Sequence, residues 1–326
     1  MSKRQKPIVY GGRGKNLGTR VPWDDAPPTM SKWTVYYQRR SDILAQLFPL
    51  GGIYPVIKPL TGIMSDFAPY GVDFFDFCTF ACPYCIKHFV RHSLYMQKPQ
   101  HQEKEKIYVL FDTTDLRDEL IEMQLNQPVL ICPYCDPYSG TKNRLERTKK
   151  LLEAFRYVNT PFTIMTKNGA SLLSQAEYYA TFRDVIQVGT TLLTCDYNRA
   201  LELEPKCQAP MKRVVGLRKN KTCLNNTFVN LCPLLSFDDA FSVIEKTYEC
   251  TDWYYLGAYE GTDDYRAKAG VTEPLQETLE KVVEVLRDAE IKFLVGSSLA
   301  AQCPDVKLSF EEGEKTSFWK YVETND

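Results

Sequence analysis

Residues 74–88 read Phe74-Phe75-Asp76-Phe77-Cys78-Thr79-Phe80-Ala81-Cys82-Pro83-Tyr84-Cys85-Ile86-Lys87-His88 and bring three thiols into one short segment. Their spacing is Cys-x3-Cys-x2-Cys. A cubane iron–sulfur cluster takes thiolates at its corner irons, so a loop with three cysteines leaves one iron without a protein ligand and open to a chelating small molecule. We therefore interpret Cys78, Cys82 and Cys85 as candidate ligands of a [4Fe-4S] cluster.

A zinc site is the main alternative for these thiols. The segment Cys82-Pro83-Tyr84-Cys85 is repeated as Cys132-Pro133-Tyr134-Cys135, and two such elements can supply the four thiolates of a tetrahedral site. The gap between them is much longer than in a compact zinc ribbon, and Cys78 would have no role. The motif favours the cluster and leaves zinc open as the alternative.

The composition indicates a globular protein with a sizeable core, since 44% of the 326 residues are hydrophobic and 13% are aromatic. The net charge of -1 argues against a protein that binds polyanions over its whole surface. No apolar run approaches the ~18 residues that a membrane span needs, so we expect no membrane contact. Eleven cysteines without a preceding secretory segment fit a reducing compartment, and we expect a cytoplasmic location.

We expect the chain to divide into three parts. Residues 1–70 would form an irregular N-terminal extension, with a basic arm over 1–32 and a lead-in helix over 33–48. Residues 71–300 would form the main body, and residues 301–326 a C-terminal tail.

From residue 72 onward, short apolar runs alternate with helical stretches, which is typical of βα units and a parallel sheet. Pro83 suits a first helical turn, so we expect one helix to begin at the last cysteine of the motif. Leu145, Leu151, Leu152 and Phe155 give a second helix a buried face, and residues 275–286 do the same for a late helix. Residues 107–123 indicate an additional strand and helix. The predicted strands of the body are 72–77, 129–133, 162–166, 185–191, 227–232, 252–257 and 291–295.

These units predict an α/β fold, a partial (β/α)6-type barrel with an irregular N-terminal extension, whose ligand lies at the carboxyl ends of the strands. Polar and thiol side chains follow several of these strand ends. The three cysteines follow the first strand, Cys132 to Tyr138 the second and Thr166-Lys167-Asn168 the third, while Thr190-Thr191 lie along the fourth. Together they indicate a cofactor site at that edge of the sheet.

The cysteine motif, with an aromatic residue just before its last cysteine, resembles the signature of the radical S-adenosylmethionine (SAM) superfamily. In that family SAM chelates the open iron, and an electron from the cluster cleaves it to a 5′-deoxyadenosyl radical. The order of further elements is similar to the spore photoproduct lyase and DNA-repair-photolyase-like branch, over roughly residues 72–260. These elements are Asp136-Pro137-Tyr138, Arg144 to Thr148, Thr166-Lys167, Leu203-Glu204-Pro205, Pro210, Arg213 and Phe228 to Pro233.

The resemblance implies roles for individual residues. Lys167 would face the SAM carboxylate, Thr190 or Thr191 would assist it, and Tyr84 would lie near the adenine. Asp136 and Arg213 are further cofactor-binding candidates. In photoproduct lyases a cysteine at the end of the second strand donates a hydrogen atom, which implies this catalytic role for Cys135 or Cys132. Buried structural thiols are the alternative for this pair.

The resemblance also implies a nucleic-acid or nucleotide substrate and an electron donor such as flavodoxin or ferredoxin. Two basic clusters, at residues 142–150 and 212–221, could follow a phosphate backbone, or they could be ordinary charged faces of helices. The aromatic run from Trp253 to Tyr259 could stack a base or belong to the core. Radical modification of a peptide or small metabolite is a second possibility, and a zinc-stabilised nucleic-acid-binding protein without catalysis is a third.

Overall fold

The computed structural model describes residues 34–37, 56–75, 78–80, 82–85, 106–109, 113–123, 127–140, 142–259 and 261–306. Its strands are β1 (Thr34–Tyr37), β2 (Lys58–Pro59), β3 (Tyr70–Val72), β4 (Lys106–Val109), β5 (Val129–Ile131), β6 (Phe162–Met165), β7 (Ile186–Thr191), β8 (Thr227–Leu231), β9 (Trp253–Leu256) and β10 (Phe293–Val295). Its α-helices are α2 (Thr113–Met123), α3 (Lys142–Val158), α4 (Gly169–Tyr179), α5 (Tyr197–Leu203), α6 (Pro210–Lys221), α7 (Phe237–Thr247), α8 (Thr262–Lys268), α9 (Leu275–Asp288) and α10 (Ser297–Gln302).

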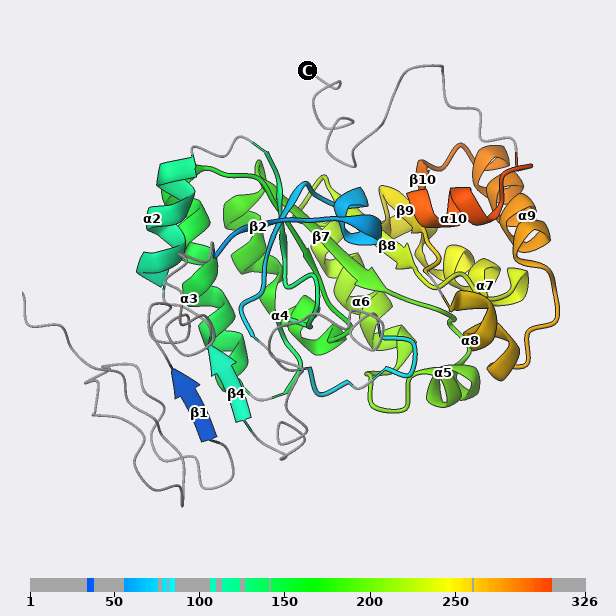
Figure 1. Cartoon of the computed structure of the whole chain (residues 1–326), viewed down its shortest axis with the longest axis horizontal. Coiled ribbons are helices and arrows are strands. Elements are labelled where there is room, and N and C mark those ends of the chain that lie inside the picture. The colour runs from blue at the N-terminus through cyan, green and yellow to red at the C-terminus, as the bar shows by residue number, and fades with distance from the viewer. Residues whose placement is uncertain are drawn as a thin grey trace, which may run out of the picture.

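The body is an eight-stranded sheet in the order β10-β9-β8-β7-β6-β5-β3-β2 (Figure 1). Every neighbouring pair is parallel except β2 and β3, which are antiparallel. The sheet stays open, because its edge strands β2 and β10 do not pair with each other. Six of the seven predicted strands coincide with β5 to β10, and β3 precedes them in the same order with different bounds, so the predicted α/β partial barrel is confirmed.

Two parts of the prediction need correction. The lead-in helix over 33–48 is wrong at its start, where residues 34–37 form β1 and pair in parallel with β4 in a separate sheet. The local sequence Thr-Val-Tyr-Tyr is rich in β-branched and aromatic residues, which favour strands. The first strand of the body is Tyr70–Val72 rather than 72–77. The rest of the lead-in helix, the basic arm and the helix expected after Cys85 lie outside the described residues.

Capping side chains that follow strands fix the starts of α4, α5 and α7. Asn168 follows β6 and accepts a hydrogen bond from the Ser171 amide at 3.0 Å, while Asp196 caps α5 by accepting one from the Arg199 amide at 2.7 Å. Ser236 caps α7 in the same way. Such caps satisfy amide groups that have no partner within the helix. They also fix the position of the residues just before each helix, at the carboxyl edge of the sheet.

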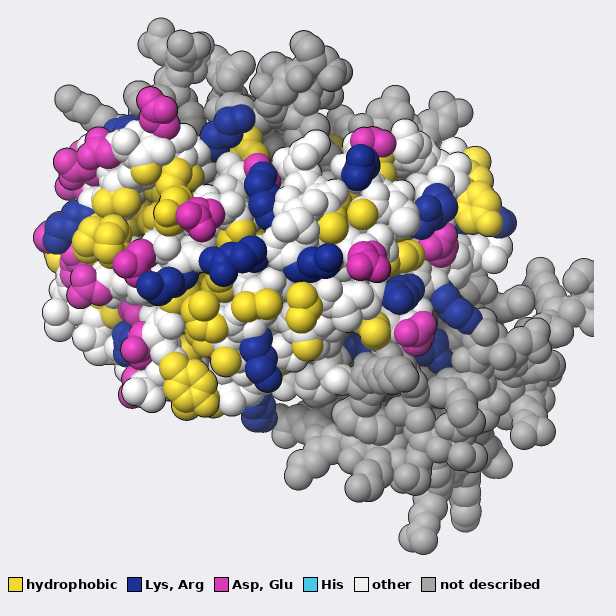
Figure 2. All heavy atoms as spheres, turned by 180° about the vertical axis from the view of Figure 1, so that it is seen from behind, with side chains coloured by type: hydrophobic (Ala, Val, Ile, Leu, Met, Phe, Trp, Pro, Cys, Tyr) yellow, Lys and Arg dark blue, Asp and Glu magenta, His cyan; other side chains and the backbone are white. Residues whose placement is uncertain are grey.

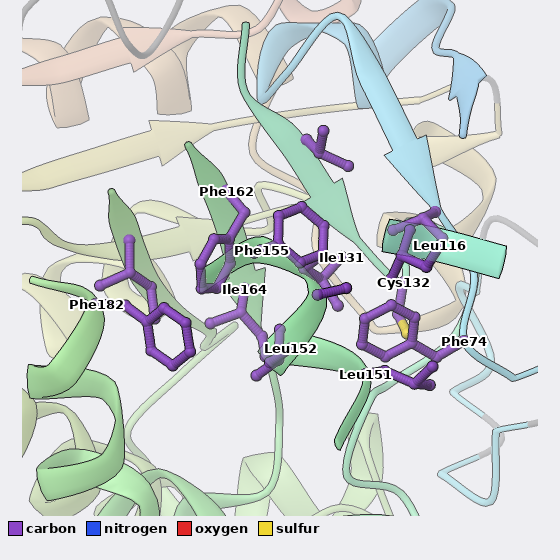
Figure 3. Packing of buried hydrophobic residues seen from close by; sticks show 14 of the residues in the cluster. Phe74, Leu116, Ile131, Cys132, Leu151, Leu152, Phe155, Phe162, Ile164 and Phe182 are labelled. Atoms are coloured by element: carbon purple, nitrogen blue, oxygen red, sulfur yellow. The ribbon is translucent and has the colours of Figure 1, made fainter. Parts of the chain in front are cut away.

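Helices cover the outer face of the sheet and bury two apolar clusters against it. In the first cluster, α3 contributes Leu151, Leu152 and Phe155, which pack on Ile131 of β5 and Phe162 of β6 (Figure 3). In the second, α7 and α9 cover β8 and β9. The predicted buried faces of α3 and α9 are therefore confirmed. Both clusters are packed with side chains and leave no room for a ligand between the helices and the sheet. A ligand site is therefore expected at the ends of the strands.

The inner, concave face of the sheet is narrow and largely filled. Phe228 and Tyr255 project into it and pack against Phe67, which follows a short 3-10 helix at Gly62–Asp66. A Cβ atom at Gly189 would lie 2.2 Å from the Phe228 ring, so only glycine fits at this point of β7. Open space on this side is left mainly above these rings, toward the carboxyl ends of the strands. Within the described part of the chain, no helix combines the length and apolar character needed to cross a bilayer.

Candidate metal and cofactor site

A cavity of about 140 Å³ lies at the carboxyl ends of the central strands. Its wall includes Thr166, Thr191 and Asn230, which stand at the ends of β6, β7 and β8. The three cysteines of the Cys-x3-Cys-x2-Cys motif line the same cavity. The cysteines of its wall are Cys78, Cys82, Cys85, Cys132, Cys135 and Cys232. The residues predicted at separate strand ends thus meet around one cavity.

The motif forms a tight turn over the cavity. The Cys85 amide donates to the Cys82 carbonyl oxygen at 3.0 Å, and the Thr79 amide donates to Ser139 Oγ at 3.3 Å. Cys82 is buried, whereas Cys78 and Cys85 are half-buried. The loop therefore presents three thiols to the same space and is anchored to the segment after β5.

The described metal-binding atoms come closest together at Cys82. Thiolates around one zinc ion lie roughly 3.8 Å apart, as follows from a Zn–S bond of about 2.3 Å in a tetrahedron. Among the described residues, the metal-binding atoms within 4.8 Å of one another form a single group, Cys82, Glu204 and Cys207. The other motif cysteines, Cys78 and Cys85, line the same cavity outside this group, as do Cys132 and Cys135.

Lys167 is the cation of the cavity. Its ammonium group lies 3.2 Å from Cys82 Sγ, donates to Tyr84 Oη at 2.6 Å and lies 3.3 Å from Glu204 Oε1. Burial would lower the pKa of Lys167, but the negative charges of Cys82 and Glu204 raise it well above its usual range. Lys167 therefore stays protonated beside the candidate cluster ligand.

A buried ion pair supports this lysine from behind. Arg213, which is 1% exposed, donates to Glu204 Oε2 at 2.6 Å and to the Thr191 carbonyl oxygen at 2.9 Å. Burial would raise the pKa of Glu204, but Lys167 and Arg213 hold it below its usual range. Glu204 also accepts a hydrogen bond from the Tyr84 hydroxyl. Arg213 thus acts on the cavity through Glu204 and does not itself line it.

Cys82 is poised as a thiolate. Its pKa is lowered to about 6, first by the contact with Cys207 and then by the Lys167 ammonium, against burial and the charge of Glu204. By contrast, burial and the nearby Asp136 raise the pKa of Cys78 to about 11. Metal ligation requires thiolates. Of these two motif cysteines, Cys82 is thus the one whose lowered pKa favours the thiolate form that binds a metal.

Asp136 lines the cavity, and hydrogen bonds to its carboxylate position Lys167. Its carboxylate accepts hydrogen bonds from the Thr166 hydroxyl at 2.8 Å and from the Lys167 and Tyr138 amides, each at 2.8 Å. The two threonines expected to assist Lys167 differ in direction. Thr191 lines the cavity, while the Thr190 hydroxyl donates to the Thr166 carbonyl oxygen at 2.8 Å.

Cys132 and Cys135 both line the cavity, because the chain turns where β5 ends. In a continuous strand they would point to opposite faces. Instead, Cys132 takes a left-handed conformation with φ of 57°, and the Cys135 amide donates to its carbonyl oxygen at 3.3 Å. A left-handed non-glycine residue is strained, and such strain is concentrated at functional sites. Burial and the neighbouring Cys132 raise the pKa of Cys135 well above its usual range, so this thiol keeps its proton.

A larger cavity of about 620 Å³ adjoins the first and shares Tyr259 with it. Its wall includes Pro83 of the cysteine motif and Tyr265 of α8. The Tyr265 ring lies 5.2 Å from the Tyr84 ring, centroid to centroid. The two cavities together offer a thiol-lined end with a buried cation and an aromatic end.

The sequence alone did not single out several residues of this site. Cys207, between α5 and α6, lies with its Sγ 3.7 Å from Cys82 Sγ, although the two are 125 residues apart. Cys232, Asn230 and Met165 also line the cavity. The signal that could have found Cys207 is its place three residues after Glu204, in a segment already matched to the photoproduct-lyase pattern.

No protein-family model matches the chain, and no curated protein sequence matches it either. Solved structures do match. SuiB from Streptococcus suis, bound to S-adenosylmethionine, is similar with a TM-score of 0.48 and 15% identity over 76% of this chain and 51% of SuiB. SuiB bound to the precursor peptide SuiA gives a TM-score of 0.47 and 18% identity over 64% of this chain and 47% of SuiB. The chain thus spans about half the length of SuiB.

A spore photoproduct lyase variant with bound AdoMet and dinucleoside spore photoproduct matches over more of its own length. It has a TM-score of 0.50 and 10% identity, over 70% of this chain and 76% of that chain. At this identity the similarity shows the fold alone. The chain therefore has the fold of this spore photoproduct lyase variant.

Proposed function

We propose that this chain is a radical SAM enzyme, with a [4Fe-4S] cluster held by Cys78, Cys82 and Cys85. The observation that carries this proposal is that the three motif cysteines and Lys167 line one cavity at the carboxyl ends of parallel strands. When bound, the cluster supplies the electron that cleaves SAM to a 5′-deoxyadenosyl radical. The protein's own contribution is to bind, orient and exclude water. An electron donor such as flavodoxin or ferredoxin would reduce the enzyme.

The position of Lys167 supports an anionic ligand group beside it. Lys167 lines the cavity, and its ammonium group lies 3.2 Å from Cys82 Sγ. A carboxylate that enters the cavity can accept a charge-assisted hydrogen bond from this ammonium group. The carboxylate of SAM would be such a group.

The aromatic end suits the adenosyl part of the same cofactor. Tyr84 belongs to the cysteine motif, and Tyr265 lies against its ring. Tyr259 stands between the two cavities. Aromatic rings stack on bases without needing a particular base. We propose that SAM binds with its methionine end at Lys167, beside Tyr84, and with its adenine toward Tyr259 and Tyr265 of the larger cavity.

The proposed reaction is tested by incubating the anaerobically reconstituted protein with SAM and a reductant. Formation of 5′-deoxyadenosine, measured by liquid chromatography and mass spectrometry, is the expected result. It should be absent for the Cys85→Ala variant, which lacks one motif ligand. A wild-type protein that takes up iron and binds SAM yet forms no 5′-deoxyadenosine under reduction would contradict the proposal.

The Lys167→Met variant should bind SAM about 10- to 150-fold more weakly, since a hydrogen bond to a charged group contributes roughly 1.5–3 kcal/mol. Its iron content should be unchanged, because Lys167 is not a ligand. Equilibrium dialysis with labelled SAM measures the affinity. Lys219→Met, on the exposed side of α6, is the matched control and should bind as wild type. Unchanged affinity in Lys167→Met would remove this lysine from the SAM site.

We further propose a nucleic-acid or nucleotide substrate, and the charge distribution supports a short one over a long duplex. Both predicted basic clusters are partly internal. Arg144 and Arg213 are each 1% exposed, and Lys221 forms an ion pair with Asp252. Among the described residues on the face seen in Figure 2, basic side chains are interspersed with acidic and apolar ones. A nucleotide or dinucleotide needs only a pocket, whereas a duplex needs a row of phosphate contacts.

Substrate classes can be separated by hydrogen abstraction. The enzyme is incubated with SAM, a reductant and, in separate reactions, ultraviolet-irradiated oligonucleotides, mononucleotides or a peptide library in deuterated form. Deuterium transfer into 5′-deoxyadenosine identifies the class that reacts. Transfer from nucleotides or oligonucleotides is expected. Transfer from peptides alone would replace the nucleic-acid proposal by peptide modification and leave the radical SAM proposal intact.

We propose Cys135 as the hydrogen-atom donor that quenches the product radical, with Cys132 beside it. Its protonated thiol at the cavity wall supports this role. Cys135→Ala should still cleave SAM to 5′-deoxyadenosine, but substrate turnover should fall at least about tenfold or give adducts, which mass spectrometry detects. Cys223→Ala, whose thiol lies outside the cavity wall, is the control. If Cys135→Ala formed the normal product at the normal rate, Cys135 would be a structural thiol and not the hydrogen-atom donor.

A further inference from the structure

We propose that Cys207 is a hydrogen-bond donor to the cluster ligand Cys82 and thereby raises the reduction potential of the cluster. This inference rests on the proposed function and adds a residue that sets the energy of electron uptake. The cysteine lies between α5 and α6, far from the motif in sequence. Its role would be to position a proton against a ligand sulfur, without binding iron itself.

The geometry brings two donors to one sulfur. Cys207 Sγ lies 3.7 Å from Cys82 Sγ, within hydrogen-bonding range for two sulfur atoms. Lys167 Nζ lies 3.2 Å from the same Cys82 sulfur. Cys207 is held in place by its own backbone, because its amide donates to the Glu204 carbonyl oxygen at 3.0 Å. Glu204 is in turn fixed by the buried Arg213.

The direction of the sulfur–sulfur contact follows from the chemistry of ligation. A cysteine bound to iron is a thiolate and has no proton to donate. In the loaded protein the proton between the two sulfurs must therefore belong to Cys207. The contact geometry therefore makes Cys207 the donor and Cys82 the acceptor in the loaded protein.

Cys207 is less suited to be a fourth ligand of the cluster. A sulfur–sulfur distance of 3.7 Å is that of two ligands on a single ion and is shorter than the spacing of ligands at separate cubane corners. The Lys167 ammonium also lies 3.2 Å from Cys82 and 3.3 Å from Glu204, where an ion shared by these residues would have to sit. A mononuclear site here would need to displace this buried cation.

The expected effect is on the cluster potential. Hydrogen bonds to ligand sulfurs are among the features that set the potentials of iron–sulfur clusters. Reduction adds negative charge to the cluster and its sulfurs, so a donor stabilises the reduced form more than the oxidised form. Removing the Cys207 proton should therefore shift the potential to a more negative value. A change of about tenfold in the reduction equilibrium equals 59 mV for a one-electron couple.

The experiment is a redox titration followed by electron paramagnetic resonance, on wild type, Cys207→Ala and Cys207→Ser, each reconstituted anaerobically and without SAM. Cys207→Ala should have a more negative midpoint potential by the amount above. Cys207→Ser retains a donor and should lie between the two. After transfer to deuterated water, wild type should lose one more exchangeable proton coupling to the reduced cluster than Cys207→Ala, in which the Lys167 ammonium remains beside Cys82. Cys223→Ala, with its thiol outside the cavity wall, is the control.

The outcomes separate this inference from the proposed function. If wild type holds no iron–sulfur cluster, the proposed function fails and the inference with it. If the cluster forms and Cys207→Ala has the wild-type potential, only the inference is overturned. Loss of the cluster in Cys207→Ala, but not in Cys223→Ala, would also overturn it by making Cys207 a ligand.

Discussion

The Cys82→Ala variant should bind no [4Fe-4S] cluster, whereas the wild-type protein should hold about four irons per chain after anaerobic reconstitution. Cys82 is the motif cysteine with the lowered pKa, and its sulfur accepts a hydrogen bond from the Lys167 ammonium group. Its loss would leave two motif ligands, and the Lys167 ammonium would keep only Glu204 and Tyr84 as partners. Iron analysis and the visible thiolate-to-iron absorption measure the effect, which should be nearly complete.

A matched control is available for the iron measurement. Cys223→Ala removes a half-buried thiol outside the cavity wall and should keep the iron content of wild type. Iron retained in Cys82→Ala would contradict the assignment of this ligand. Stoichiometric zinc without iron uptake in wild type would instead favour the zinc alternative, in which the two Cys-Pro-Tyr-Cys elements share an ion.

The sequence predicted the sheet well because its strands are buried on both faces. The strands β5 and β9 are buried along their whole length, and they appear in the sequence as short runs of apolar and aromatic residues. The prediction was least accurate at β3. The run after Val72 contains two adjacent phenylalanines, Phe74 and Phe75, which are both fully buried beyond the strand. An apolar run of this kind does not by itself tell a strand from a packed loop.

The ligand loop and the strand ends could be predicted because they depend on local spacing and on topology. The partners of Lys167 could not, since they depend on how α5 and α6 pack against β7. Arg213 illustrates the difference. On a helix rich in lysine and arginine it was expected to be exposed or to face a ligand, but it is buried and bonded to Glu204. Only the three-dimensional structure identifies which basic residue of α6 points inward.

The turn at Cys132 is a second example. Alternation along a strand predicts that Cys132 and Cys135 face opposite sides unless the chain turns at Pro133. The chain does turn, and the left-handed conformation of Cys132 begins that turn. No local sequence signal requires a cysteine to adopt positive φ. The convergence of six thiols on one cavity was therefore visible only in part from the sequence.

Arg213→Met should destabilise the cluster-free protein by about 3–5 kcal/mol, the cost of breaking a buried ion pair by removing one partner. Arg213 and Glu204 are both nearly inaccessible, with side chains 1% and 2% exposed, and the Thr191 carbonyl oxygen would lose a donor as well. Urea unfolding followed by circular dichroism measures the loss. Lys219→Met removes the exposed pair with Glu177 and should cost much less.

A double variant separates an unpaired charge from a general packing defect. In Arg213→Met with Glu204→Leu, neither member of the pair remains, so part of the stability should return relative to Arg213→Met alone. The recovery should be incomplete, because Lys167 and Tyr84 also lose their bonds to Glu204. If the double variant lost as much free energy of unfolding as Arg213→Met and Glu204→Leu lose together as single variants, the two side chains would contribute independently. The ion pair would then not be what holds Lys167 in the cavity.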